Sequence, residues 1–266
     1  MYQYLKLLDW IPLNKLNFEG LSRNRNAILI LEENLKKVNW DSLSYNPNAI
    51  HILAKNPDKI EWDRLCCSKR GVHILKKNPD RINWDNLSCN LNAISMLLQN
   101  KDKANWKNLS SNYNAIQLLE ENPYNNDWMN LSLNCNAIHL LELIIEQNPN
   151  NVSWEFVSAN TSAIDILGRH FNHINWRYLS WNCNAIDLLE NNPDRINWQT
   201  LSENEGAIHL LKNNQHRIDW IYLSYNTGIF ELNYNKIDER MNIIKEEMMA
   251  KLFHPRNIDK FNQRGF

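Results

Sequence analysis

A tryptophan recurs every 22 residues along most of this chain. The series is Trp40, Trp62, Trp84, Trp106 and Trp128, and after one interval of 26 residues it resumes at Trp154, Trp176, Trp198 and Trp220. A fixed period of this length indicates a stack of small units, because each unit buries its apolar face against its neighbours and no single closed core is required. Phe18 stands in the place of the tryptophan in an earlier copy, so we expect about ten units.

The conserved positions within the unit predict two helices. With the tryptophan as position one, Leu stands at position four, Ser at five, Asn at seven and Ala-Ile at ten and eleven. Asn39 precedes Trp40 as a helix N-cap, and this first helix is short enough to be α or 3₁₀. Asn46 caps the second helix, with Pro47 at its first residue. Apolar residues at positions ten, eleven, thirteen and fourteen then follow a helical stripe.

Two further features support a helix in the second half of the unit. The long interval places four extra residues within 140–146, which is about one helical turn. Asn56-Pro57 ends the helix, because proline cannot continue its hydrogen bonds. Helices this short are unstable alone, so each must be stabilised by packing against the helices of neighbouring repeats. We therefore predict an all-α fold, an α-solenoid of about ten 22-residue two-helix repeats, curved and elongated to roughly 90–100 Å at 8–10 Å per packed helix.

The chain divides into three predicted parts. Residues 1–17, which contain the truncated motif at Trp10, form an N-terminal cap, and residues 18–234 form the solenoid. Residues 235–266 form a C-terminal capping helix and tail. The helix is expected over 236–253, with an apolar face that covers the last repeat. Presentation of that face to a partner is the alternative. Its apolar residues are Ile237, Met241, Ile244, Met248 and Leu252.

Composition argues against several classes of function. The 29 basic and 30 acidic residues leave a net charge of −1, which gives no support for binding to nucleic acid or to an anionic membrane. No secretory signal or membrane-spanning run is present, so the five cysteines are expected to be reduced thiols, buried or half-buried. The repeated histidines at position twelve, such as His51 and His139, are expected to be solvated, with no metal site and no cofactor.

Variable aromatic positions are the strongest candidates for a binding surface. If Trp10 counts as a truncated start, Trp181 is the one tryptophan outside position one, and it stands at position six. In repeat arrays the variable positions on one edge commonly bind a partner, and Tyr and Trp are favoured interface residues. Packing of these rings against neighbouring repeats is the alternative. The candidates are Tyr45, Tyr113, Tyr178, Trp181, Tyr222 and Tyr225.

The repeat resembles that of multi-copy repeat proteins encoded by giant DNA viruses of the mimivirus type. Residues 40–60 match the phrase Trp-x-x-Leu-Ser-x-Asn-Pro-Asn-Ala-Ile-x-Leu-Leu-x-x-Asn-Pro-Asp-Lys-Ile at nearly every position. Residues 249–266 are similar to a closing motif of the same proteins. The resemblance implies a viral protein located in the host cytoplasm or in the virion, and it implies no catalytic residues. The third unit departs most, since residues 66–71 replace Ser-x-Asn-Pro-Asn-Ala, and we expect a local distortion or a contact site there.

Three functions are compatible with these features. The first is a non-catalytic scaffold that binds a host or viral protein. The second is a structural component of the virion or viral factory that acts by self-association. The third is an RNA-binding solenoid, which would need a basic face. An enzyme would need converging polar groups in a deep pocket, and the sequence shows no such set.

Overall fold

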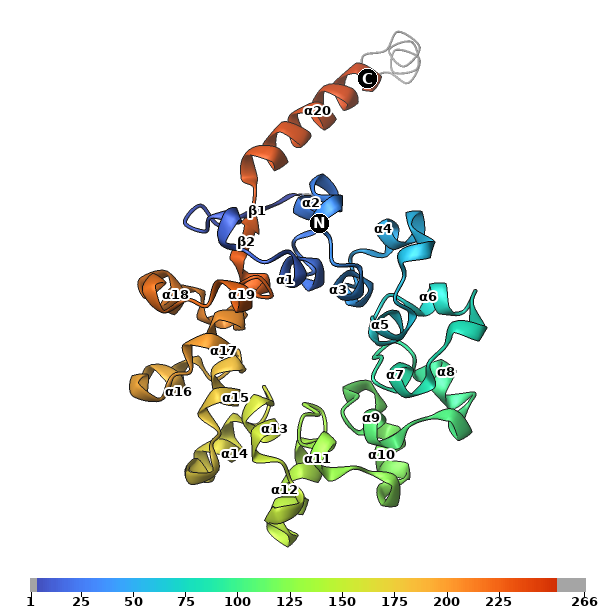
Figure 1. Ribbon diagram of the computed structural model, residues 1–266, viewed down its shortest axis with the longest axis vertical. Coiled ribbons are helices and arrows are strands. Elements are labelled where there is room, and N and C mark those ends of the chain that lie inside the picture. The colour runs from blue at the N-terminus through green and yellow to red at the C-terminus, as the bar shows by residue number, and fades with distance from the viewer. Residues whose placement is uncertain (1–3, 253–266) are drawn as a thin grey trace, which may run out of the picture.

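The repeats form a closed ring in the computed structural model, which describes residues 4–252 (Figure 1). The first helices of the repeats lie side by side along the inner side of the ring, and the second helices lie outside them. The all-α repeat architecture predicted from the sequence is confirmed. The predicted elongated shape is wrong, because the first and last helices of the inner row contact each other.

Each of the first nine repeats contains three short helical segments, and the tenth has a first helix but no second α-helix. The first helices are α1 (Phe18–Arg23), α3 (Trp40–Tyr45), α5 (Trp62–Cys67), α7 (Trp84–Ser88), α9 (Trp106–Ser110), α11 (Trp128–Leu131), α13 (Trp154–Ala159), α15 (Trp176–Trp181), α17 (Trp198–Glu203) and α19 (Trp220–Leu223). The second helices are α2 (Ile28–Glu33), α4 (Ile50–Lys55), α6 (Val72–Leu75), α8 (Ile94–Leu98), α10 (Ile116–Glu121), α12 (Ile138–Gln147), α14 (Ile164–Arg169), α16 (Ile186–Glu190) and α18 (Ile208–Asn213).

The third segment is a 3₁₀ turn that the sequence interpretation missed. These turns are η2 (Leu13–Lys15), η3 (Leu35–Lys37), η4 (Pro57–Lys59), η5 (Pro79–Arg81), η6 (Lys101–Lys103), η8 (Pro123–Asn125), η9 (Pro149–Asn151), η10 (Phe171–His173), η11 (Pro193–Arg195) and η13 (Gln215–Arg217). Three others, η7 (Tyr113–Ala115), η12 (Glu205–Ala207) and η14 (Thr227–Ile229), follow a position-seven asparagine. The proline of the Asn-Pro pair thus ends one helix and begins the next turn.

The predicted N-cap asparagines are present, but the second helix begins later than predicted. Asn39 caps α3 by accepting the N–H of Ser42 at 2.9 Å. Asn46 accepts the N–H of Asn48, so it caps a turn, and α4 begins only at Ile50. The four inserted residues lengthen the second helix as predicted, since α12 has 10 residues where most second helices have 5 or 6.

The position-one tryptophans are half-buried and pack against the core. Fully buried leucines at positions four and fourteen, with Ala at ten, form the core. A cation from the 3₁₀ turn of the same repeat covers the outer face of many rings, which is a favourable cation–π arrangement. The Nζ or Cζ to centroid distances are 4.7 Å for Lys59–Trp40, 5.8 Å for Arg81–Trp62, 4.9 Å for Lys103–Trp84, 5.0 Å for Arg195–Trp176 and 4.9 Å for Arg217–Trp198.

The position-seven asparagines, which we call the asparagine ladder, join each repeat to the one before it. The Nδ2 of Asn46 donates to the carbonyls of Ser22 and Asn24 in the preceding repeat, both at 2.9 Å. The same pair of bonds recurs at Asn90, Asn112, Asn134, Asn182, Asn204 and Asn226. The position-five serine adds a hydrogen bond to the residue that caps the first helix of the next repeat. For example, Ser22 Oγ accepts the N–H of Asn39 at 3.0 Å. The ladder was predicted mainly as a set of caps, and here it also ties the repeats together.

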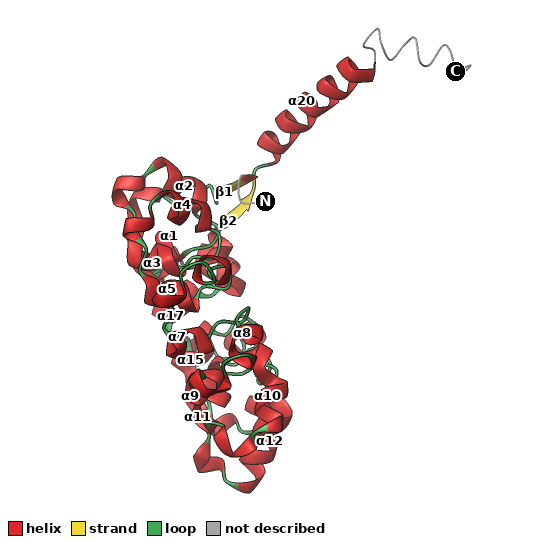
Figure 2. Ribbon diagram, turned by 90° about the vertical axis from the view of Figure 1, so that its right-hand side faces the viewer, coloured by secondary structure: helices red, strands yellow, loops and turns green. Residues whose placement is uncertain are grey.

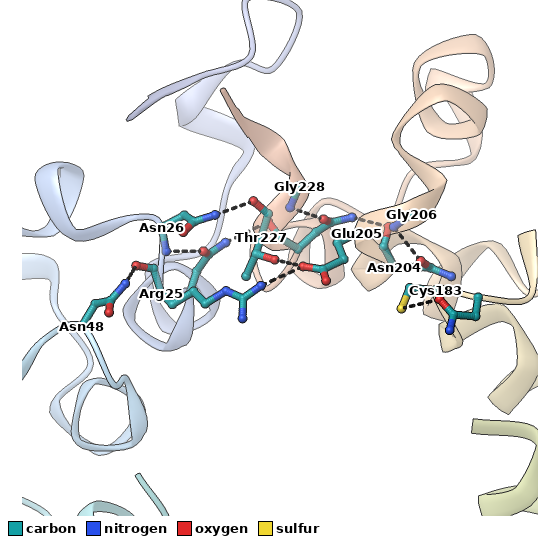
Figure 3. Close-up of polar contacts among 12 residues, drawn as sticks. Arg25, Asn26, Asn48, Cys183, Asn204, Glu205, Gly206, Thr227 and Gly228 are labelled. Carbon is teal, nitrogen blue, oxygen red and sulfur yellow. Dashed lines mark hydrogen bonds and ion pairs between the residues drawn. The ribbon is translucent and has the colours of Figure 1, made fainter. Parts of the chain in front are cut away.

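The same bonds close the ring between the two ends of the chain. Asn24 in the first repeat donates to the carbonyls of Ser224 and Asn226 in the last repeat, at 3.2 and 2.9 Å. Asn26 donates to the carbonyl of Thr227 at 2.9 Å, and both partners are labelled in Figure 3. The first repeat therefore binds the tenth as any repeat binds its predecessor.

The N-terminal segment completes the tenth repeat and does not cap a free end. Asn17 N–H donates to Ser224 Oγ at 2.7 Å, and Lys15 covers Trp220 at 4.6 Å, which are the contacts that residues 22 positions later make in the first repeat. In addition, β1 (Leu5–Leu7) pairs antiparallel with β2 (Phe230–Leu232). One repeat is thus divided between the two ends of the chain.

The C-terminal helix α20 (Tyr234–Leu252) leaves the ring beside this sheet and covers no repeat (Figure 2). None of its residues is buried. The expectation that it caps the last repeat is wrong, because α1 and the N-terminal segment already cover that repeat. The tail at 253–266, which includes most of the closing motif, lies outside the described residues.

The third repeat carries the expected distortion. Ser68 replaces the ladder asparagine, and its buried Oγ has no hydrogen-bond partner among the described residues. The second helix α6 is reduced to 4 residues. Gly71 replaces the usual alanine, since a Cβ there would lie 2.4 Å from the carbonyl oxygen of Leu65. The ladder is therefore interrupted between the second and third repeats.

We predict that Ser68→Asn stabilises the ring. The backbone at Ser68 (φ −76°, ψ 125°) matches that at Asn46 (φ −72°, ψ 115°), so an asparagine would reach the carbonyls of Ser44 and Asn46. The restored bonds should raise the free energy of unfolding by ~1–2 kcal/mol, measured by urea denaturation. The reverse change, Asn90→Ser, should lower it by a similar amount. A destabilised Ser68→Asn variant would contradict this account.

We also predict that Gly20→Ala loosens the joint that closes the ring. A Cβ at Gly20 would lie 2.6 Å from Ser224 Cβ, and such overpacking costs ~1–3 kcal/mol. The matched control is Gly168→Ala, also within a helix but with nothing within 4 Å, which should gain ~0.5–1 kcal/mol. Thermal unfolding and small-angle scattering would measure stability and ring dimensions. Equal stabilisation by both changes would contradict a tight closing joint.

Candidate functional site

The centre of the ring is lined by the two most variable positions of the repeat. Two cavities, of about 390 and 510 Å³, lie within it, and between them they are lined by positions six and eight of all ten repeats. We call this surface the channel wall. Position six provides Arg23, Tyr45, Cys67, Cys89, Ser111, Leu133, Ala159, Trp181, Glu203 and Tyr225, and position eight provides Arg25, Pro47, Lys69, Leu91, Tyr113, Cys135, Thr161, Cys183, Glu205 and Thr227.

The asparagine ladder explains why these positions face the channel. The backbone at position seven is extended, with φ −72° and ψ 115° at Asn46. In extended backbone, side chains on either side of a residue point away from its own side chain. Because the asparagine points into the preceding repeat, its two neighbours point into the channel. This alternation was visible in the sequence and could have identified the whole channel wall.

Four of the six predicted aromatic residues line the channel. Tyr45 and Trp181 border both cavities, although they come from the second and eighth repeats. Tyr225 borders the smaller cavity and Tyr113 the larger one. Trp181 keeps 45% of its surface exposed, so its ring is available for contact. The structure thus brings together side chains that are up to 180 positions apart along the chain.

The other two predicted residues, both at position three, are not among the residues that line the two channel cavities. Tyr178 borders an adjoining cavity of about 330 Å³, and its ring packs edge-on against Phe156 at 6.4 Å. This cavity shares four residues with the channel wall: Leu133, Ala159, Trp181 and Glu203. Tyr222 borders none of these three cavities and is half-buried. Tyr178 stands three residues before Trp181 in α15, so the two side chains share one face of that helix, and Tyr178 lies at the edge of the channel wall.

Polar contacts cross the channel wall between repeats. Arg25 in the first repeat pairs with Glu205 in the ninth at 3.2 Å, and Glu205 also accepts a hydrogen bond from Thr227 (Figure 3). Lys69 Nζ donates to Tyr113 Oη at 2.9 Å. With Arg23 and Glu203, the wall carries three cations and two carboxylates, so it is close to neutral. These contacts were not predicted from the sequence.

Burial changes the ionisation of several channel groups. Burial raises the pKa of the Glu203 carboxyl, and the nearby Arg23 guanidinium and Trp181 side chain offset only part of that effect. Burial also raises the pKa of Tyr225. The pKa of Cys67 is raised to about 11, first by burial and then by the neighbouring Cys89, so this thiol stays protonated at neutral pH.

The position-twelve histidines lie on the second helices, outside the inner row of first helices (Figure 1). Three of them contact a glutamate of the preceding repeat: His51–Glu32 at 2.7 Å, His139–Glu120 at 2.8 Å and His209–Glu190 at 2.9 Å. Within residues 4–252, no three His, Cys, Asp or Glu side chains are grouped around a metal position. In the same region, no helix is both long and apolar enough to cross a membrane.

An open groove of about 660 Å³ lies between α4 and α6, where the third repeat is distorted. It is lined by Lys69, Arg70 and Lys76 together with His51 and His73. Lys69 belongs to both the groove and the channel wall. The groove lies beside α6, which is shorter than the second helices on either side of it.

Comparison of the chain with protein-family models, with curated protein sequences and with solved structures gave no match in any of the three.

The raised pKa of Glu203 predicts a pH-dependent cost to stability. The folded state holds the Glu203 proton more tightly than the unfolded chain does, so the cost is absent below the ordinary carboxyl pKa and complete above the raised pKa. Glu203→Gln should therefore raise the free energy of unfolding at neutral pH by less than ~1 kcal/mol, because solvent screens this group, with no gain in acid. Denaturation at both pH values would measure it. Glu205→Gln, which removes an exposed ion pair, should give no such gain at neutral pH.

Proposed function

We propose that the protein is a non-catalytic scaffold that binds a segment of a partner protein in the channel of the ring. The observation that supports this most is the division of labour within the repeat. Positions four, five, seven and ten repeat with little change and build the ring, whereas positions six and eight differ from repeat to repeat and all face the channel. A variable surface carried by a constant framework is typical of binding by repeat proteins.

The chemistry of the channel wall favours a polypeptide over a nucleic acid. Aromatic rings at Tyr45, Tyr113, Trp181 and Tyr225 provide rigid apolar surface, and such residues often dominate the energy of protein interfaces. The cations and carboxylates nearly balance. Binding to RNA would instead require an excess of positive charge along the surface. A mixed wall of this kind matches an extended segment with alternating apolar and charged residues.

The resemblance to giant-virus repeat proteins extends the proposal to the kind of partner. It suggests a host or viral protein that the ring meets in the host cytoplasm or in the virion.

Panning a display library of random peptides against the ring would test the proposal. Peptides that bind the channel should lose at least about tenfold in affinity on Trp181→Ala, because removal of a central aromatic anchor commonly costs more than ~1.4 kcal/mol. The matched control is Leu98→Ala on the outer helix α8, since Leu98 (46%) and Trp181 (45%) are equally exposed. Isothermal titration calorimetry would give the dissociation constants. Selected peptides that bind the wild type and Trp181→Ala equally would contradict binding in the channel.

A further inference from the structure

The helix α20 presents an exposed apolar stripe that no described part of the chain covers. Met241 is 46% exposed and Met248 58%, and Ile237 and Ile244 are half-exposed. The helix has 19 residues, and at 1.5 Å per residue it is about 28 Å long. It points away from the ring (Figure 2). The stripe itself runs over residues 237–248, about 17 Å of that length, and an exposed stripe of this kind on a projecting helix is typical of a surface that packs against another molecule.

The stripe has the spacing of a coiled coil. Residues 237, 241, 244 and 248 are separated by four, three and four positions, so they occupy the alternating d and a positions of a heptad. The flanking e positions then hold Asp238 and Lys245, and the flanking g positions hold Arg240 and Glu247. Charges at e and g positions decide which helices pair and in which direction.

These charges select an antiparallel pair of identical helices. When Met241 packs beside Ile244 of a second copy, Asp238 lies beside the second Lys245, and Arg240 lies beside the second Glu247. Twofold symmetry makes each contact twice, so four pairs of opposite charge flank the stripe. In a parallel pair, Arg240 would lie beside the second Lys245, and both such contacts would be repulsive. Opposite charge is thus matched at every flanking position in one direction only.

We propose that the protein forms a homodimer through antiparallel pairing of α20 with the α20 helix of a second copy. The dimer places one ring at each end of the helix pair, so that two channels are carried by one assembly. This inference rests on α20 alone and stands whether or not the channel binds a peptide. Because the helix has fewer than three heptads, the dimer is weak and its population depends on protein concentration.

Sedimentation equilibrium of the full chain over a wide concentration range would test the dimer. The wild type should change from monomer to dimer as its concentration rises. Ile244→Lys places a charge in the centre of the stripe and should weaken the dimer at least tenfold. Ile243→Lys makes the same change at the adjacent residue, which lies outside the stripe, and should leave the dimer within about twofold of the wild type. A strict monomer at the highest concentration, or equal effects of the two changes, would overturn the proposal.

The direction of pairing is tested by reversing one charge. Lys245→Glu makes the contact with the second Asp238 repulsive in the antiparallel dimer and should weaken it several-fold. In a parallel dimer the same change would relieve the repulsion with Arg240 and strengthen association. The double variant Asp238→Lys/Lys245→Glu restores opposite charges and should recover the antiparallel dimer. Lys236→Glu, outside the flanking positions, is the control for net charge. Stronger association of Lys245→Glu would overturn the antiparallel arrangement.

Discussion

The structure depends on one side chain, the asparagine at position seven of the repeat. Its Nδ2 donates to two backbone carbonyls of the preceding repeat, and its Oδ1 accepts the N–H two residues ahead, as at Asn112. A buried asparagine can make these three bonds at once, and leaving them unmade would expose carbonyls to an apolar interior without partners. The repeat-to-repeat contact is thereby fixed in geometry as well as in energy. These hydrogen bonds set the spacing between neighbouring first helices in the inner row.

The same asparagine connects the ring to its candidate site. Because its side chain is directed toward the neighbouring repeat, the residues before and after it are directed into the channel. Substitutions at positions six and eight therefore change the channel wall while the asparagine hydrogen bonds between repeats stay in place. This separation explains how Trp181, Glu203 and Cys67 can occupy equivalent positions in one structure. It also explains why burial alters the ionisation of Glu203 and Cys67 while the ring stays regular.

The sequence predicted the unit well and the assembly poorly. The period, the caps at Asn39 and its equivalents, and the extra helical turn in α12 all follow from local rules about helices. Ring closure does not, because it depends on a small rotation between neighbouring repeats that accumulates around the ring. A clue was present at both ends: residues 13–17 match the end of a repeat, and the tenth repeat lacks that end. Trp181 was found because it breaks the pattern, whereas Arg25 and Glu205 were missed because their contact joins distant repeats.

The division of the tenth repeat between the two chain ends has a kinetic consequence. Every other joint in the ring is crossed by the covalent backbone, whereas the joint between α19 and α1 is held by hydrogen bonds, the Arg25–Glu205 pair and the β1–β2 sheet. In the proposed mode of binding, a polypeptide segment with a free end would enter the channel while the ring is closed. A loop without a free end can enter or leave only when this one joint separates. The lifetime of such a topologically enclosed loop would then be set by the opening rate of the joint, independently of how tightly the channel wall holds it.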